Sequence, residues 1–218
     1  MKIGFFGCSH VGGFYPTYYN LAEEVAAKCP QHEIYDYSFG GHSQQMILYL
    51  FEKFKQEHDF NIVKITSPGR LSFFNNYDFA KNRKFKTSNF NTWSNLSYYG
   101  KNVVRMNYSS CPLSVAEPKY SLKSIKKLHK MYYSHISYEL ANIESLAITK
   151  YLQSSADFLY AHRAFQKEAM PDGILCTEKF LLPNYQSYVI DEGYHLGLEG
   201  TKAEAEWLIN NIKELNHA

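Results

Sequence analysis

The sequence has little of what would mark a disulfide framework, a zinc site or a membrane span. Its 218 residues contain four scattered cysteines and no C-x-x-C pair: Cys8, Cys29, Cys111 and Cys176. This scatter indicates reduced thiols in a cytosol-like compartment. No run approaches the roughly 18 apolar residues of a membrane span, and the apolar stretch after Lys2 is too short for a secretory signal. We therefore expect a cytoplasmic protein with no membrane span.

Net charge is also nearly absent. The 23 basic and 21 acidic side chains leave +2, which gives no electrostatic reason to expect nucleic acid or a charged membrane surface as a partner. The chain shows no ligand-spaced cluster and no phosphate-binding glycine fingerprint, so we expect neither a metal nor an organic cofactor. Aromatic residues, by contrast, are abundant, with 19 Tyr and 15 Phe.

Apolar runs and amphipathic segments alternate over the first 70 residues. Strands are predicted at 2–7, 33–41 and from 61 until Pro68-Gly69 stops the third, and helices at 18–28 and 43–58, the second with Ser43 as its N-cap. Strand, helix, strand, helix, strand is typical of a parallel sheet with right-handed crossovers. We predict one domain over 1–218, a three-layer α/β/α sandwich with a roughly five-stranded parallel sheet.

The alternation breaks after the third strand. Residues 71–117 are rich in Asn, Ser, Phe and Tyr without a sustained period, so they are predicted to be a functional insertion or a lid. Exposed aromatics there would suit a sugar-stacking surface or an acyl pocket; they would equally suit a subdomain that covers the core or forms a homo-oligomer. The remaining expectations are a long helix over 118–153, a fourth strand at 157–163, a fifth at 173–180 or 187–191, and a last helix over 198–215.

Three separated segments carry residue types suited to nucleophilic catalysis. They are GCSHVGG at the end of the first strand, SFGGHSQQ at the end of the second, and DEGYHLG before the last helix. Carboxyl ends of parallel strands share one edge of a sheet, where ligands bind in open α/β folds. The loop that leads into the last helix can bring His195 to that edge.

A serine hydroxyl at this edge needs a base, and the base needs an orienting carboxylate. Ser9 is the candidate nucleophile and His195 the base, with Glu192 or Asp191 as the acid. Main-chain N–H groups of Ser9 and of Gly40 or Gly41 are candidate oxyanion donors.

Each of these residues also has a structural interpretation. Ser9 could simply end a strand, and the two acids could stabilise a helix N-terminus. His10 and His42 could line the site or serve as hydrogen-bonded loop histidines. Cys8 is better interpreted as a small buried residue than as a thiolate.

The three motifs together resemble those of the SGNH (GDSL-type) hydrolase superfamily. In that family the nucleophilic serine follows the first strand in Gly-Asp-Ser, a glycine follows the second strand, and Asp-x-x-His precedes the last helix. The resemblance covers both ends of the chain and implies the flavodoxin-like fold of that superfamily with an insertion after strand three.

The chain departs from this family pattern at three places. Cys8 stands where the family has Asp, Glu192 takes the acid position of Asp-x-x-His, and the Gly-x-Asn-Asp motif is absent after strand three. A side-chain oxyanion donor from that loop would have to come from a substitute: Thr66, Ser67, Arg70 or Asn75. Losing one such donor costs about two to three orders of magnitude in rate.

The resemblance implies a serine esterase or O-acyltransferase acting on small acyl esters, such as acetyl groups of a carbohydrate. Two alternatives stay open at this point. One is a catalytically impaired SGNH-fold protein that binds a glycan or a partner protein. The other is a lipase-like esterase for longer acyl chains.

Overall fold

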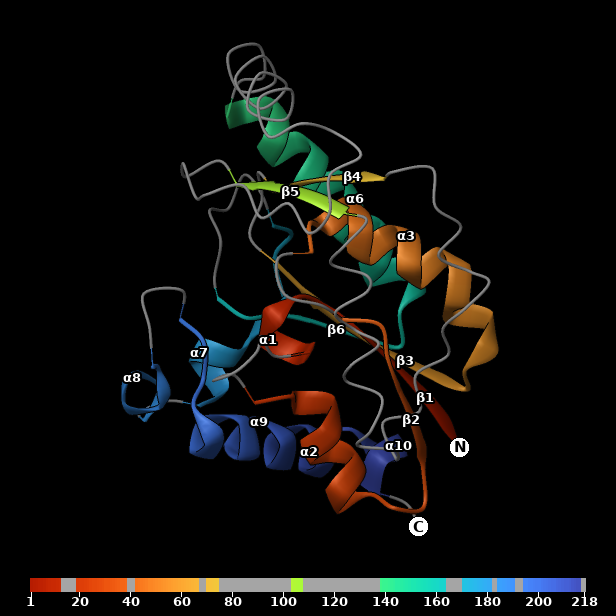
Figure 1. Cartoon of the computed structure of the whole chain (residues 1–218), viewed down its shortest axis with the longest axis vertical. Helices are drawn as coiled ribbons and strands as arrows, with labels where there is room; N and C mark the ends of the chain where they lie inside the picture. The colour runs from red at the N-terminus through yellow and green to blue at the C-terminus, as the bar shows by residue number, and fades with distance from the viewer. Residues whose placement is uncertain are drawn as a thin grey trace.

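A parallel five-stranded sheet forms the centre of the protein (Figure 1). The computed structural model describes residues 1–12, 19–38, 42–66, 70–74, 103–107, 138–163, 170–181, 184–190 and 194–216. The strand order is β2-β1-β3-β6-β7, and all pairings in this sheet are parallel. The strands are β1 Lys2–Phe6, β2 Glu33–Asp36, β3 Phe60–Ile65, β6 Phe158–Ala161 and β7 Leu175–Cys176. The predicted parallel α/β sheet is confirmed.

Helices cover both faces of this sheet (Figure 1). The first face packs against α3 Gln44–Phe54 and α6 Tyr138–Ser155. The other face packs against α2 Leu21–Lys28, α9 Leu198–Asn211 and α10 Lys213–Asn216. Short turns complete the described elements: α1 Ser9–Gly12, η1 Lys55–Glu57, α7 Thr177–Phe180 and α8 Tyr185–Tyr188.

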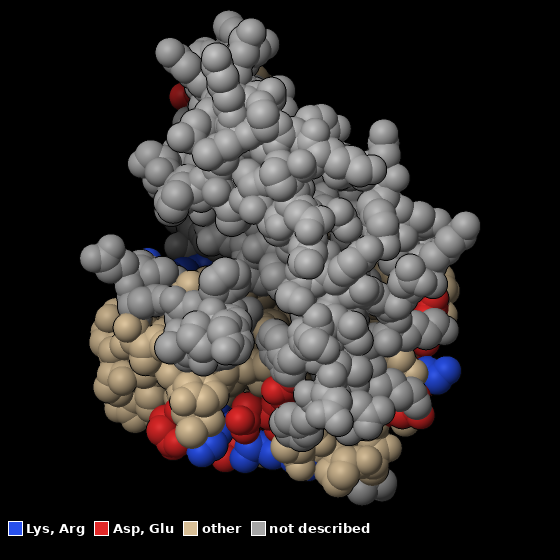
Figure 2. Space-filling model, in the orientation of Figure 1, with Lys and Arg blue, Asp and Glu red and all other residues tan. Residues whose placement is uncertain are grey.

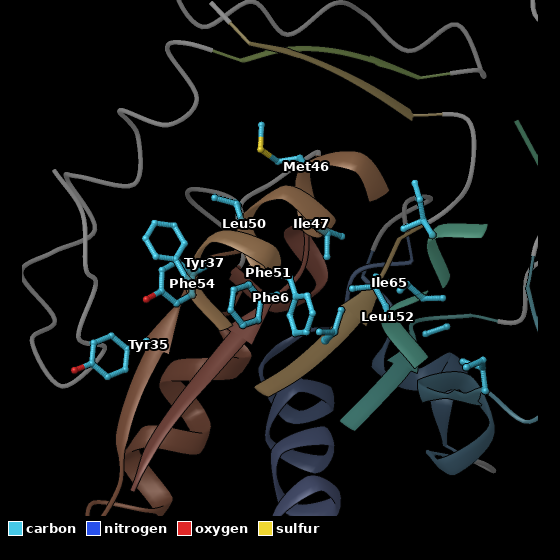
Figure 3. Close-up of a cluster of buried hydrophobic side chains, with 14 of the residues drawn as sticks. Phe6, Tyr35, Tyr37, Met46, Ile47, Leu50, Phe51, Phe54, Ile65 and Leu152 are labelled. Carbon is cyan, nitrogen blue, oxygen red and sulfur yellow. The ribbon is translucent and has the colours of Figure 1, made fainter. Parts of the chain in front are cut away.

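The period of two along each strand sorts side chains between the two faces. Phe6 points toward α3, where it stacks on Tyr37 and meets Phe51 edge-on (Figure 3). Ile3 and Phe5 lie in the cluster under α2 and α9. Because both faces of the sheet are buried, successive residues of each strand must be mostly apolar.

Polar caps fix where the helices begin. Ser43 Oγ accepts from Met46 N at 3.2 Å, as predicted for an N-cap. Asn20 caps α2 by accepting from Glu23 N at 3.1 Å, and its Nδ2 donates to the buried Asp36 carboxylate at 2.9 Å. The start of α2 is thereby tied to the end of β2.

Several expected elements differ in detail. The region expected to lack a period contains an antiparallel pair, β4 Arg70–Phe74 with β5 Val103–Asn107; five-residue strands are too short to show a sustained pattern in sequence. The fifth strand is β7, and 187–191 instead contributes Val189 to an isolated bridge with Leu196. The last helix breaks at Ile212, whose extended backbone lets both Ile212 and Leu215 be buried. Of the helix expected over 118–153, residues 118–137 lie outside the described residues.

Phe51 provides a test of the α3 side of the core. Its side chain is fully buried, so Phe51→Ala should lower the free energy of unfolding by about 3–5 kcal/mol in urea denaturation. Tyr49→Ala is the matched control on the same helix, because Tyr49 is 37% exposed; it should cost less than about 1 kcal/mol. Equal losses would contradict the packing described for this face.

Candidate active site

Ser9 lies at the point where β1 gives way to a single helical turn. The turn is closed by Val11 N and Gly12 N donating to Cys8 O at 3.0 and 3.1 Å. A Cβ on Gly7 would approach Val11 Cγ2 to 2.6 Å, and one on Gly12 would approach Ser38 Oγ to 2.5 Å. The glycines therefore let the turn fold tightly against β2, with Ser9 only 8% exposed at the carboxyl edge of the sheet.

His195 reaches Ser9 from the other end of the chain. Its Nε2 lies 2.8 Å from Ser9 Oγ, a hydrogen bond across 186 residues of sequence. The loop that carries His195 is held by Ile190 N donating to His195 O at 2.9 Å and Gly197 N donating to Tyr188 O at 2.8 Å. The predicted serine and histidine thus lie within hydrogen-bonding distance of each other.

Three imidazole rings stack beside the serine. The His10 ring lies 3.6 Å from that of His162 and 4.5 Å from that of His195, with interplanar angles of 11° and 23°. His162 follows the end of β6, so a second strand end, besides that of β1, contributes to the site. Its Nε2 is 2.6 Å from Tyr194 O and 3.1 Å from the Tyr185 hydroxyl.

His162 is held neutral by its surroundings. Burial lowers its pKa well below the usual value, and the nearby Lys64 charge adds to this. Because Tyr194 O can only accept, the proton of the neutral ring is assigned to Nε2.

A buried ion pair lies beneath the serine turn. Lys64 Nζ on β3 and Glu204 Oε1 on α9 are 2.5 Å apart, with both side chains 1% exposed. Lys64 also donates to His10 O at 3.1 Å. Tyr160 Oη and Thr177 Oγ1 donate to the same Glu204 oxygen at 2.9 and 3.3 Å. Burial lowers the Lys64 pKa, which the Glu204 carboxylate opposes, and burial raises that of Tyr160.

A small recess opens over these groups. It encloses about 240 Å³, including space open to solvent, and the described residues that line it are Ser9, His10, Tyr19, His162, His195, Leu196, Thr201 and Glu204. Nucleophile and base therefore border the same recess.

The other candidates from sequence fall in different places. His42 is buried, with Nδ1 3.0 Å from Gly7 O, so it supports the turn before Ser9. Arg70, expected in the loop after the third strand, is the first residue of β4. Gly40, Gly41, Ser67, Asn75, Asp191 and Glu192 lie outside the described residues.

Sequence reasoning missed His162, Lys64 and Glu204. The sequence did contain signals for them: His162 follows an expected parallel strand, and Lys64 interrupts an otherwise apolar strand. A lone lysine in a doubly covered strand requires a buried partner.

No protein-family model matches this chain, and none of the curated protein sequences matches it. What the structure shows is an α/β fold with a five-stranded parallel sheet.

Within the described part of the chain, no three His, Cys, Asp or Glu side chains gather in a way that could hold a metal ion. Nor does any described helix have the length and apolar character to cross a bilayer. Acidic and basic side chains are interspersed where they show on the face seen in Figure 2.

The ion pair can be tested by removing one or both partners. Glu204→Gln leaves a buried ammonium without its carboxylate and should lower the free energy of unfolding by about 3–5 kcal/mol, whereas Lys64→Met/Glu204→Leu should recover most of this loss. Lys28→Met, at the exposed pair with Glu206, is the control and should cost less than about 1 kcal/mol. Urea denaturation measures all three, and a double variant no better than Glu204→Gln would contradict this account.

Acid should destabilise the protein partly through His162. Because its folded-state pKa is lowered, the unfolded chain gains a proton below pH 6.5 that the folded protein resists. The free energy of unfolding should therefore fall as pH drops from 6.5, by up to about 1.4 kcal/mol per pH unit. Chemical denaturation of wild type and His162→Gln at pH 7.5 and 5.5 measures the difference; identical pH slopes would count against a buried neutral His162.

Proposed function

We propose that this protein is a serine-dependent acyl-ester enzyme of the SGNH type, an esterase or an O-acyltransferase. The observation that carries the proposal is the 2.8 Å contact between His195 Nε2 and Ser9 Oγ at the carboxyl edge of a parallel sheet. Supporting it, both residues line the same recess. A serine that merely ended a strand would not require a histidine from the last loop of the chain.

The contact suits general-base catalysis of acyl transfer. His195 Nε2 takes the hydroxyl proton as Ser9 Oγ attacks the ester carbonyl, and the imidazolium then returns that proton to the departing alcohol. Water, or a sugar hydroxyl in the transferase version, next gives its proton to His195 and attacks the acyl-enzyme. Collapse of the second tetrahedral intermediate releases the acid or the new ester and restores Ser9.

The remaining roles follow from the sequence motifs. Glu192 or Asp191 is proposed to orient His195, and main-chain N–H groups of Ser9 and of Gly40 or Gly41 to stabilise the oxyanion. Ser67 or Arg70 is proposed in place of the missing Asn donor. The substrate class, small acyl esters of a carbohydrate, rests on the family resemblance, and the modest size of the recess is compatible with it.

Three buried free thiols support a reducing, cytoplasmic setting: Cys8, Cys29 and Cys176.

The first test is turnover of p-nitrophenyl acetate. Ser9→Ala and His195→Ala should each lower kcat by about 10⁴-fold or more, because nucleophile and base act as a unit. Ser154→Ala, an exposed serine on α6, is the control and should keep wild-type turnover. If the folded wild type is inert, or if Ser9→Ala retains activity, the enzyme proposal fails. An inert but folded protein would favour the glycan- or partner-binding alternative.

Acyl-chain length separates the two esterase alternatives. We expect kcat/KM for p-nitrophenyl acetate to exceed that for the octanoate, because the family resemblance implies small acyl groups and the described residues leave only a small recess beside Ser9. A clear preference for octanoate would point to the lipase-like alternative. Ser9→Ala measured with both esters provides the background rates.

A further inference from the structure

Tyr194, the residue directly before His195, has an unusual backbone. Its φ of 60° makes it the one non-glycine residue with positive φ among the described residues. A side chain in the left-handed region is sterically disfavoured, so the surrounding structure must hold it there. Tyr194 therefore carries backbone strain directly before the proposed base, His195.

Two neighbouring residues at the end of β6 hold Tyr194. His162 Nε2 donates to Tyr194 O at 2.6 Å. The Arg163 guanidinium lies 3.6 Å from the centroid of the Tyr194 ring, a cation–π contact. One contact fixes the main chain and the other the side chain of the same residue.

The Tyr194 carbonyl belongs to the peptide unit that ends at His195 N. Peptide planarity means that fixing this oxygen also fixes the direction in which the backbone enters His195. The neighbouring backbone hydrogen bonds join Ile190 N to His195 O and Gly197 N to Tyr188 O. Neither involves the peptide between Tyr194 and His195, so other contacts must orient that peptide.

The imidazole stack provides a second connection. His10 lies between His162 and His195, at 3.6 and 4.5 Å. His162 can therefore affect the position of His195 in two ways. It bonds to the Tyr194 carbonyl, which belongs to the peptide unit before His195, and it stacks on His10, whose ring lies beside that of His195. The buried Tyr185 hydroxyl, 3.1 Å from His162 Nε2, holds the first ring in turn.

We propose that His162 and Arg163 are positioning residues that hold Tyr194 in its left-handed conformation and so aim His195 Nε2 at Ser9 Oγ. The catalytic consequence of this arrangement rests on the function proposed above. The positioning itself does not, and it can be measured in a protein that turns nothing over.

The direct experiment is ¹⁵N NMR of the His195 side chain. Replacing Ser9 by Ala removes the hydrogen-bond partner of His195 Nε2, so the shift of this nitrogen should change between wild type and Ser9→Ala. In a His162→Leu background the base is no longer aimed at Ser9, and the same Ser9→Ala change should leave the shift unaltered. In a His162→Gln background the response should return, because the Gln amide restores an N–H donor near the Nε2 position.

Kinetics give the second readout. His162→Leu should lower kcat for p-nitrophenyl acetate by about 10²-fold with KM within about twofold, since misplacement of a catalytic group by about 1 Å has that effect. His162→Gln should recover most of kcat. His58→Leu is the control: His58 precedes β3 at the opposite edge of the sheet, hydrogen-bonds to Tyr37 Oη at 3.1 Å, and should leave turnover unchanged.

Arg163→Ala keeps the proposal falsifiable if His162→Leu does not fold. Arg163 is partly exposed, so its loss should be tolerated, while kcat falls about tenfold and the His195 response to Ser9→Ala weakens. A full response in folded His162→Leu or in Arg163→Ala would overturn the proposal, as would equal effects of Leu and Gln at 162. A wild type that shows the NMR response without ester turnover would refute the proposed function and leave the positioning role standing.

Discussion

The buried pair of Lys64 and Glu204 is the interaction on which the rest of the site depends. An ammonium that is 1% exposed has no water to solvate it, so a carboxylate must meet it. That requirement fixes α9 against β3 and β6, and α9 begins three residues after His195. Through His10 O the same ammonium holds the turn that contains Ser9. This charge pair therefore helps to position both partners of the 2.8 Å contact.

Positioning is divided among several parts of the molecule. The parallel sheet brings the carboxyl ends of β1, β2 and β6 to one edge, which is the coarse requirement for any site there. Glycines at 7 and 12 let the serine turn fold without a clash. Tyr194, and the two residues after β6 that hold it, set the final orientation of His195. A hydrogen bond is sensitive to small displacements of a side chain, and the sheet does not restrict these in a loop.

The sequence predicts the sheet from local signals: apolar runs of strand length and helix caps such as Ser43. It predicts the Ser9–His195 pair from polar residues in separated segments, after the first strand and before the last helix. The lone lysine in the third strand signals a buried partner, but no pattern in the sequence identifies that partner as Glu204, 140 residues away. The sequence places His162 in the expected fourth strand, but it does not predict the ring stack with His10 and His195, because loops far apart in the chain bring these rings together. The strain at Tyr194 could not be inferred either, because the residue type there does not favour positive φ.

The free cysteines of the described chain are distributed so that each reports on a different region. Cys8 lies between β1 and the Ser9 turn, Cys29 ends α2 with its thiol toward Leu215 O, and Cys176 lies in the edge strand β7. All three are buried, and burial raises the thiol pKa of Cys29 and Cys176, so reaction with an alkylating reagent requires local opening. The alkylation rates of the three thiols therefore measure how often each region opens to solvent. Cys8 reports on the nucleophile turn, Cys29 on the helical layer and Cys176 on the sheet edge.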